Sequence, residues 1–229
     1  GPIVKLTVLS KNEEESKEIS IVRDIIQIPV LDTEEKPDGI FIISMYNFSG
    51  NSANIFRNAL REFVLSGKNK LILDLRGNPG GYLESAVDVA SWFLPAGKVV
   101  VREKFSDDKE TIFRSRGYDI FQSLPMVILI NEGSASASEI VAGALREHGA
   151  AKLVGQKTFG KGSVQELIQI TPETSLKLTI AKWLTPNGRS ISDEGLEPDI
   201  AVEITKKDME AGRDPQMEKA LEMLKNWKN

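Results

Sequence analysis

The sequence predicts an α/β fold in which the strands of a mainly parallel sheet alternate with helices. Two stretches, 71–94 and 126–148, each run from an apolar strand through a turn of small residues into a helix. Repeated strand–turn–helix units favour a parallel sheet, and open sheets of this kind place their sites at the carboxyl ends of the strands. Strand-like residues at 3–9 and 19–22 predict a β-hairpin ahead of this core.

The composition is that of an ordinary globular protein. The chain has 229 residues, of which 41% are hydrophobic and 27% are charged. Its length and its hydrophobic fraction are sufficient for a sizeable core. The net charge of −4 gives no electrostatic footprint for nucleic acid, and no apolar run approaches the roughly 18 residues that span a bilayer. The chain has no cysteine, which excludes disulfides and thiolate chemistry. We expect no nucleic-acid partner, no metal and no cofactor.

The chain divides into four parts. In order, we expect a hairpin at 1–23, a linker at 24–38, a core at 39–205 and a terminal helix within 206–229. Pro29 and Pro37 favour the linker assignment, and Asp214 followed by Pro215 is typical of a helix start. Residues 104–123 mix charged and aromatic side chains, so we expect them to form an excursion over the core.

Within the core, the pattern of apolar residues separates strands from helices. Short apolar runs predict strands at 39–45, 71–75, 98–103, 126–130, 153–155 and 200–204. Apolar residues three or four positions apart predict helices at 53–65 and 83–94, and a third that passes through 140–145. Residues 163–170 and 176–181 have the character of a second hairpin.

Three serines follow the strand at 126–130, within the sequence NEGSASASE at 131–139. A strand, a turn and a helix in this order bring free backbone N–H groups and the positive end of a helix dipole to one point. Ser134, Ser136 and Ser138 lie there. Because one serine is enough to cap a helix, the longer run of small residues indicates a functional site, with capping as the alternative.

The only histidine, His148, does not fit a Ser-His-Asp triad. If residues 136–148 form one helix, His148 lies about 18 Å along the axis from Ser136. A general base has to lie about 3 Å from the group that it deprotonates. We therefore interpret His148 as a C-terminal helix residue that the helix dipole favours, and look for another base.

Lysine can serve as a general base where burial lowers its pKa from about 10.4. Most of the 29 Lys and Arg residues lie in charged surroundings. Lys161 differs, because no other charged residue lies between Lys157 and Glu166. Glycines on both sides would let the backbone turn tightly and bring the side chain into a pocket. A solvent-exposed lysine in a glycine turn is the alternative.

Residues 155–161 also match the GxxxxGK pattern of a phosphate loop. That pattern requires Ser or Thr next, at the start of a helix, whereas Gly162 follows here and a strand is predicted at 163–170. The only acidic residue suited to hold Mg²⁺ near a strand end is Asp74, which we expect inside a strand. Nucleotide binding is therefore disfavoured.

An acyl-transfer reaction also needs N–H donors for the negative charge that develops on the carbonyl oxygen. The N–H of Ala137, at the start of the third helix, is one candidate. Gly80 and Gly81 lie in the companion turn after the strand at 71–75, and glycine allows the backbone to approach a substrate closely. A plain turn is the alternative interpretation of these glycines.

Taken together, these motifs resemble those of the carboxy-terminal processing, or tail-specific, serine proteases. Four segments match in order: LDLRGNPGG at 73–81, GSASASEI at 133–140, TFGKG at 158–162 and GLEPD at 195–199. The resemblance covers most of residues 39–205. It implies a ClpP/crotonase-like protease core and a serine endopeptidase that cleaves proteins near their apolar C-termini.

The resemblance also implies roles for single residues. Ser136, the middle serine, is the implied nucleophile, and Lys161 is the implied general base. Gln165 is implied to orient the lysine. A straight strand separates positions 161 and 165 by about 13 Å, so a bend near Gly162 or converging side chains must close the distance.

The resemblance further implies oxyanion donors in the Gly80–Gly81 turn and at Ala137. Ser134, Ser138 and Glu139 then shape and cap the turn. The implied substrate is an extended apolar segment that binds beside a core strand by β-augmentation.

Members of this family normally carry a PDZ domain before the core, which binds substrate C-termini and gates activity. Residues 1–23 match only the last strands of such a domain. The resemblance implies protein C-termini as partners, allows a homo-oligomer and a regulatory adaptor, and places the protein in the periplasm or cell envelope. A non-catalytic scaffold and a protease core that is latent without its PDZ domain are the alternatives.

Overall fold

The structure, a computed structural model, describes residues 1–10, 15–25, 29–121, 123–192 and 194–227. Its largest sheet has six strands in the order β12-β9-β8-β5-β4-β3. Five of them are parallel: β4 (Ile40–Met45), β5 (Lys70–Asp74), β8 (Met126–Ile130), β9 (Lys152–Gly155) and β12 (Ile200–Ala201). The strand β3 (Leu31–Glu35) runs antiparallel to β4 at one edge. The predicted α/β fold is confirmed.

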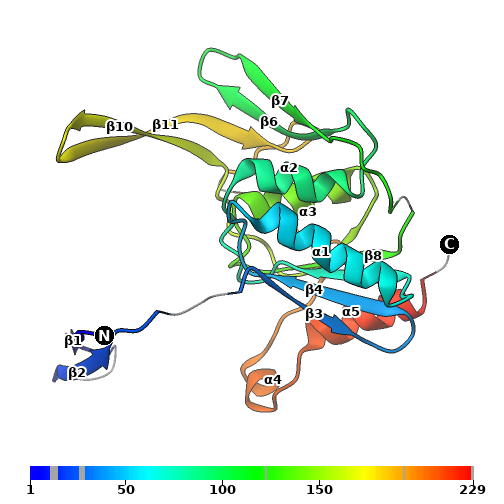
Figure 1. Ribbon diagram of the computed structural model, residues 1–229, viewed down its shortest axis with the longest axis horizontal. Coiled ribbons are helices and arrows are strands. Elements are labelled where there is room, and N and C mark those ends of the chain that lie inside the picture. The colour runs from blue at the N-terminus through cyan, green and yellow to red at the C-terminus, as the bar shows by residue number, and fades with distance from the viewer. Residues whose placement is uncertain (11–14, 26–28, 122, 193, 228–229) are drawn as a thin grey trace.

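Helices cover both faces of this sheet (Figure 1). One face carries α1 (Ser52–Leu65), α2 (Leu83–Ser91) and α3 (Ala137–Glu147), and the other carries α5 (Pro215–Lys225). Side chains alternate between the faces, since Leu73 packs beneath the first three helices and Ile72 packs with Ala220 and Leu224 of α5. Burial on both faces explains the continuous apolar runs in the sequence.

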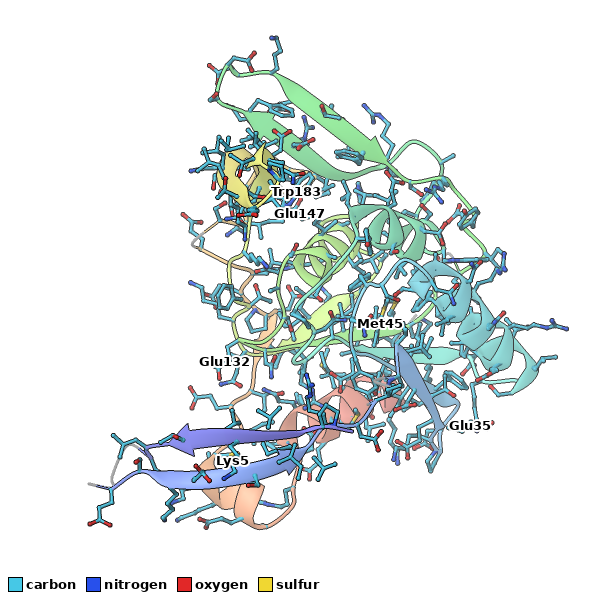
Figure 2. All side chains as sticks on the ribbon, turned by 60° about the vertical axis from the view of Figure 1, so that its left-hand side comes forward. Lys5, Glu35, Met45, Glu132, Glu147 and Trp183 are labelled. Carbon is cyan, nitrogen blue, oxygen red and sulfur yellow. The ribbon has the colours of Figure 1, made fainter. Side chains whose placement is uncertain are left out.

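A second sheet has four antiparallel strands in the order β10-β11-β6-β7. They are β6 (Val99–Phe105), β7 (Glu110–Arg114), β10 (Ser163–Thr171) and β11 (Thr174–Leu184). Trp183 joins this sheet to the main core and packs edge-on against Phe113, with ring centroids 6.0 Å apart (Figure 2). The other end of the β10–β11 hairpin projects from the body as a two-stranded arm (Figure 1).

At the N-terminus, β1 (Ile3–Val8) and β2 (Lys17–Val22) form the predicted antiparallel hairpin. Apart from the half-buried Val4, every side chain in both strands is exposed. An isolated two-stranded hairpin is marginally stable in water. That it is the remnant of a PDZ domain stays a prediction.

Two expectations about domain organisation need correction. The linker expected at 24–38 contains β3, although residues 26–28 of that range lie outside the described part of the chain. Asp32, Glu34 and Glu35 obscured this strand in the sequence, because an edge strand with exposed side chains carries charge without an apolar pattern. The excursion at 104–123 includes β7, and its residues Phe113 and Phe121 pack against the core.

The C-terminal part is also more divided than expected. A short helix, α4 (Lys206–Glu210), precedes α5, and Thr205 and Asp214 cap the two helices separately. Elsewhere, α2 ends at Ser91 and β12 at Ala201, three residues earlier than predicted in each case. Among the described helices, none is both long and apolar enough to cross a membrane.

Candidate active site

The site forms where β5 and β8 end side by side. These strands are parallel neighbours, and each leads through a turn into a helix, as the sequence predicts. The two turns are joined by backbone and side-chain hydrogen bonds. Ala135 N–H donates to Asn78 O at 3.0 Å, and Gly77 N–H donates to Asn131 Oδ1 at 2.8 Å. The turn at 75–81 and the turn at 131–136 therefore form one rigid unit.

The three serines have different surroundings. Ser134 Oγ donates to Leu75 O at 2.8 Å, and Ser138 Oγ donates to Asn78 O at 3.0 Å, so both hydroxyls hold the neighbouring turn. Both side chains are completely buried, whereas Ser136 is partly exposed. Of the three, Ser136 alone is accessible to a substrate from solvent.

Ser136 also has an unusual backbone conformation. Its φ is 54° and its ψ is −112°, in a region that non-glycine residues rarely adopt. Such a conformation costs about 1–3 kcal/mol and persists only where surrounding contacts enforce it. Ser136 lies immediately before α3, so its side chain stands at the N-terminal end of the helix. The sequence gives no sign of this strain.

Gly80 makes the closest approach to the serine. With φ at +93°, a Cβ placed on Gly80 would lie 2.9 Å from Ser136 Cβ and 2.6 Å from Ala135 O. Gly81 is similarly enclosed, because its Cβ would lie 2.1 Å from Phe48 O. Both positions therefore require glycine.

The candidate oxyanion donors differ in availability. The Gly80 N–H donates to Asn78 Oδ1 at 2.9 Å. Within the described residues, no acceptor takes the N–H of Gly81 or of Ala137. The Ala137 N–H would lie only 2.8 Å from a Cβ on Gly80, so the turn and the helix start meet at the serine. The two free donors are thus those of Gly81 and Ala137.

Glu139 joins the serine to the lysine loop. Its completely buried carboxylate accepts four hydrogen bonds. Oε2 takes the N–H of Ser136 at 2.8 Å and the N–H of Lys161 at 3.0 Å. Oε1 takes the Thr158 hydroxyl and the Gly160 N–H. The sequence shows only an acid three residues after a serine, which is the pattern of a helix cap.

The backbone of Lys161 lies beside the serine turn, whereas Gln165 lies in β10, where it pairs with Thr179 of β11. Lys161 is exposed, and among the described residues no hydrogen bond joins it to Ser136 or to Gln165. The β10–β11 pairing has a register shift between Val164 and Gln165, and the expected approach of Gln165 to Lys161 stays a prediction. The burial that would lower the pKa of a lysine is therefore absent at Lys161 in this structure.

The structure disfavours both a phosphate loop at 155–161 and a Ser-His-Asp triad that uses His148. Residues 163–171 form the strand β10, whereas a phosphate loop is followed by a helix. His148 ends α3, as interpreted, and its Nε2 lies 2.7 Å from Val99 O. In the described part of the chain, no cluster of three or more His, Cys, Asp or Glu residues could hold a metal ion.

The ion pairs of Arg76 were not predicted from the sequence. Arg76, in the turn after β5, forms ion pairs with Asp74 at 2.6 Å and with Asp214 at 2.8 Å. Burial alone lowers the pKa of Arg76, but the hydrogen bonds to Asp74 and Asp214 outweigh burial and raise that pKa. Asp214 also caps α5, so this cluster ties the C-terminal helix to the turn at 75–81.

Comparisons with known proteins identify the family of the chain. A family model described as peptidase family S41 matches residues 39–202. A protein of Staphylococcus haemolyticus named "Probable CtpA-like serine protease" is 39% identical over 203 residues, which make up 88% of this chain and 40% of that protein. A protein of Staphylococcus aureus strain N315 with the same name is 38% identical over 204 residues, or 89% of this chain and 40% of the relative.

Among solved structures, the photosystem II D1 C-terminal processing protease matches with a TM-score of 0.74 and 26% identity. The match covers 86% of this chain and 54% of that protein. The chain spans about two fifths of the length of the curated relatives that it matches.

Proposed function

The chain belongs to peptidase family S41, and on that premise we propose that it is a serine endopeptidase of the carboxy-terminal processing type. The observation that carries the proposal is the shared oxygen of Glu139. The backbone nitrogens of Ser136 and Lys161 are 2.8 and 3.0 Å from this one atom, which holds them within about 6 Å of each other.

In the proposed reaction, Ser136 Oγ attacks the carbonyl carbon of a peptide bond. Uncharged Lys161 accepts the serine proton and returns it to the leaving amine, with Gln165 orienting the lysine. The N–H groups of Ala137 and the Gly80–Gly81 turn bind the oxyanion, and the free N–H of Gly81 favours that glycine as donor. Water then hydrolyses the acyl-enzyme and releases Ser136.

The substrate that we propose is the extended, apolar C-terminal region of a protein. Binding would cover Lys161, which is exposed in its absence, and would exclude water from the site. A PDZ domain, a homo-oligomer, a regulatory adaptor and a location in the periplasm or cell envelope remain proposals drawn from the family resemblance. A latent core or a non-catalytic scaffold remains the rival.

Labelling with a fluorophosphonate, which phosphonylates the hydroxyl of an activated serine with loss of fluoride, tests the proposal. We expect mass spectrometry to find the adduct on Ser136, and the Ser136→Ala variant to show none. Because Lys161 activates the serine, Lys161→Ala should slow labelling while leaving the unfolding temperature unchanged. An unlabelled Ser136 in the folded wild-type chain would support the scaffold or latent alternative instead.

A further inference from the structure

We propose that Ser192 is a positioning residue, whose hydroxyl group holds the amine of Lys161 for proton transfer. This inference rests on the proposed function, because it takes Lys161 as the general base. It deepens that function by assigning a role to a side chain outside the four segments that match the family motifs.

Ser192 and Lys161 each carry a polar group without a partner. Within the described residues, Ser192 Oγ is shielded from solvent and forms no hydrogen bond. The side-chain amine of Lys161 has no hydrogen-bond or ion-pair partner among these residues either. A buried hydroxyl without a partner is unfavourable and uncommon in folded proteins. A hydrogen bond that forms during catalysis would account for it.

The Ser192 hydroxyl packs directly against the residue that follows Lys161. A Cβ placed on Gly162 would lie 2.7 Å from Ser192 Oγ and 2.2 Å from Ser192 N. That Cβ would be about 1.5 Å from its own Cα, and consecutive Cα atoms are about 3.8 Å apart, so Ser192 Oγ lies within about 8 Å of Lys161 Cα. The four-carbon stem of a lysine together with a hydrogen bond of about 3 Å covers this distance.

Two contacts hold Ser192 beside the lysine loop at 158–162. At the start of the loop, Leu196 N–H donates to Thr158 Oγ1 at 2.7 Å, and Thr158 N–H donates to Leu196 O at 3.1 Å. At the end of the loop, Gly162 approaches Ser192 too closely to carry a side chain. The hydroxyl therefore has a fixed place relative to the loop that carries the base.

Gln165, to which the family resemblance gives the role of orienting the lysine, has different surroundings. It is exposed on β10 and pairs with Thr179 of β11. Water competes for the hydrogen bonds of an exposed amide, whereas a shielded oxygen forms stronger bonds because its local dielectric is lower. Ser192 therefore offers an acceptor that Gln165 does not replace.

A hydroxyl group suits both protonation states of the lysine amine. Its oxygen accepts an N–H of the neutral amine, which leaves the nitrogen lone pair free to take the proton of Ser136. After the transfer, the ammonium group still donates to the same oxygen until it returns the proton to the leaving amine. Ser192 itself neither gains nor loses a proton, so it acts only through Lys161.

The rate at which fluorophosphonate labels Ser136 tests this role. Ser192→Ala should lower the second-order rate constant of labelling by about tenfold or more, because a hydrogen bond to a charged group is lost. The unfolding temperature of this variant should equal or exceed that of the wild type, since the substitution removes a hydroxyl without a partner. A purely structural residue would not separate the two measurements in this way.

Ser115→Ala is the matched control, with the opposite expectation. The Ser115 hydroxyl is also buried, but it donates to Leu94 O at 2.8 Å and accepts the N–H of Gly117 at 3.0 Å. Ser115→Ala should therefore lower the unfolding temperature and leave the labelling rate of Ser136 unchanged.

A double-mutant cycle then shows whether Ser192 acts through Lys161. Labelling is compared in the wild type, in Ser192→Ala, in Lys161→Ala and in the double variant. We expect Ser192→Ala to change the rate by less than about twofold once Lys161 is absent, because the interaction that it removes no longer exists.

Three results would overturn the inference: a labelling rate of Ser192→Ala within about twofold of the wild type, a clear fall in its unfolding temperature, or the same slowing with and without Lys161. Failure of the proposed function is a different outcome, which removes the premise. It would be seen as a wild-type Ser136 that is not labelled, or as a Lys161→Ala variant that is labelled at the wild-type rate.

Discussion

Glu139 connects Ser136 and Lys161, the proposed nucleophile and base, through a single carboxyl group. Each of its oxygens accepts two hydrogen bonds, and each of these bonds fixes part of the serine turn or of the lysine loop. All four donors are backbone or hydroxyl groups that shape these two loops, so we propose that Glu139 is a positioning residue. In the proposed mechanism Ser136 performs the chemistry and Glu139 holds it in place.

Glutamine has nearly the same size and shape as glutamate. Replacing Glu139 with glutamine should therefore displace Ser136 and Lys161 without leaving a cavity. The amide presents donors to groups that are themselves donors, and a lost hydrogen bond to a charged group costs about 1.5–3 kcal/mol. We expect Glu139→Gln to lower kcat by about tenfold or more, with KM nearly unchanged. Steady-state kinetics on an apolar peptide measures both constants.

Glu132 supplies the control for this change. It lies in the turn that precedes α3 and is exposed (Figure 2), so Glu132→Gln should leave kcat and the unfolding temperature as in the wild type. Equal kinetic effects of the two substitutions would show that Glu139 does not position the catalytic groups.

At the scale of elements, the turns at 75–81 and 131–136 depend on glycine at the point where they approach most closely. A methyl group on Gly80 would overlap Ala135 O and the Ser136 side chain. We expect Gly80→Ala to destabilise the protein by about 1–3 kcal/mol, from strain and overpacking, and to abolish cleavage. Urea unfolding and peptide turnover measure the two effects.

Gly67 is the matched control for Gly80. Its φ of +68° is also positive, but a Cβ there meets no atom within 4 Å. Gly67→Ala should therefore cost stability through backbone strain alone and retain full turnover. A Gly80→Ala variant that cleaves as fast as Gly67→Ala would contradict the close packing of the two turns.

The elements that the sequence predicts well are those with a strong apolar pattern. The strands β4, β5 and β8 and the helix α1 could be predicted because burial imposes a continuous or helical run of apolar residues. The strand β3 and the helix α4 could not, since one is an acidic edge strand and the other has five residues. Residues 31–35 form a strand because they pair with β4, and their own sequence does not predict a strand.

Parts of the candidate site could also be predicted from the sequence. The serine run, the glycine turn and the lysine loop could be found because each has a local motif, and the family resemblance selected Ser136. The positive φ of Ser136 and the contacts of Glu139 depend on tertiary packing. The contact of Arg76 with Asp214 joins residues 138 positions apart, a separation at which no local pattern exists.

At the scale of the whole molecule, the ion pair of Arg76 with Asp214 connects the turn at 75–81 to the helix α5. Burial alone raises the pKa of Asp214, but the hydrogen bonds from Arg76 and from the N–H of Met217 outweigh it and lower the pKa below its ordinary range. Folding therefore favours the ionised form of this carboxyl group. The two layers of the fold on either side of the large sheet are coupled through this contact.

This coupling predicts a pH dependence of stability. Because the folded-state pKa is the lower one, the contribution of Asp214 is complete above the unfolded-state pKa of about 3.9 and is lost as pH falls through the folded-state pKa. Wild-type protein should be more stable than Asp214→Asn at pH 7, and the difference should shrink below about pH 4. Urea unfolding across pH measures it.

The corresponding control is again the exposed Glu132. The Glu132→Gln variant should follow the wild-type stability curve at every pH. A difference between wild type and Asp214→Asn that stayed constant from pH 7 down to the acid transition would contradict an ionised Asp214 paired with Arg76.

The central claim is that Ser136 and Lys161 form the catalytic pair, and turnover of an apolar C-terminal peptide by single variants tests it most directly. A general base contributes about 10²–10⁴-fold to the rate. We predict that Lys161→Ala lowers kcat by that factor and that Ser136→Ala abolishes turnover, both with an unchanged circular dichroism spectrum. A folded Lys161→Ala variant with near-normal kcat would contradict the account.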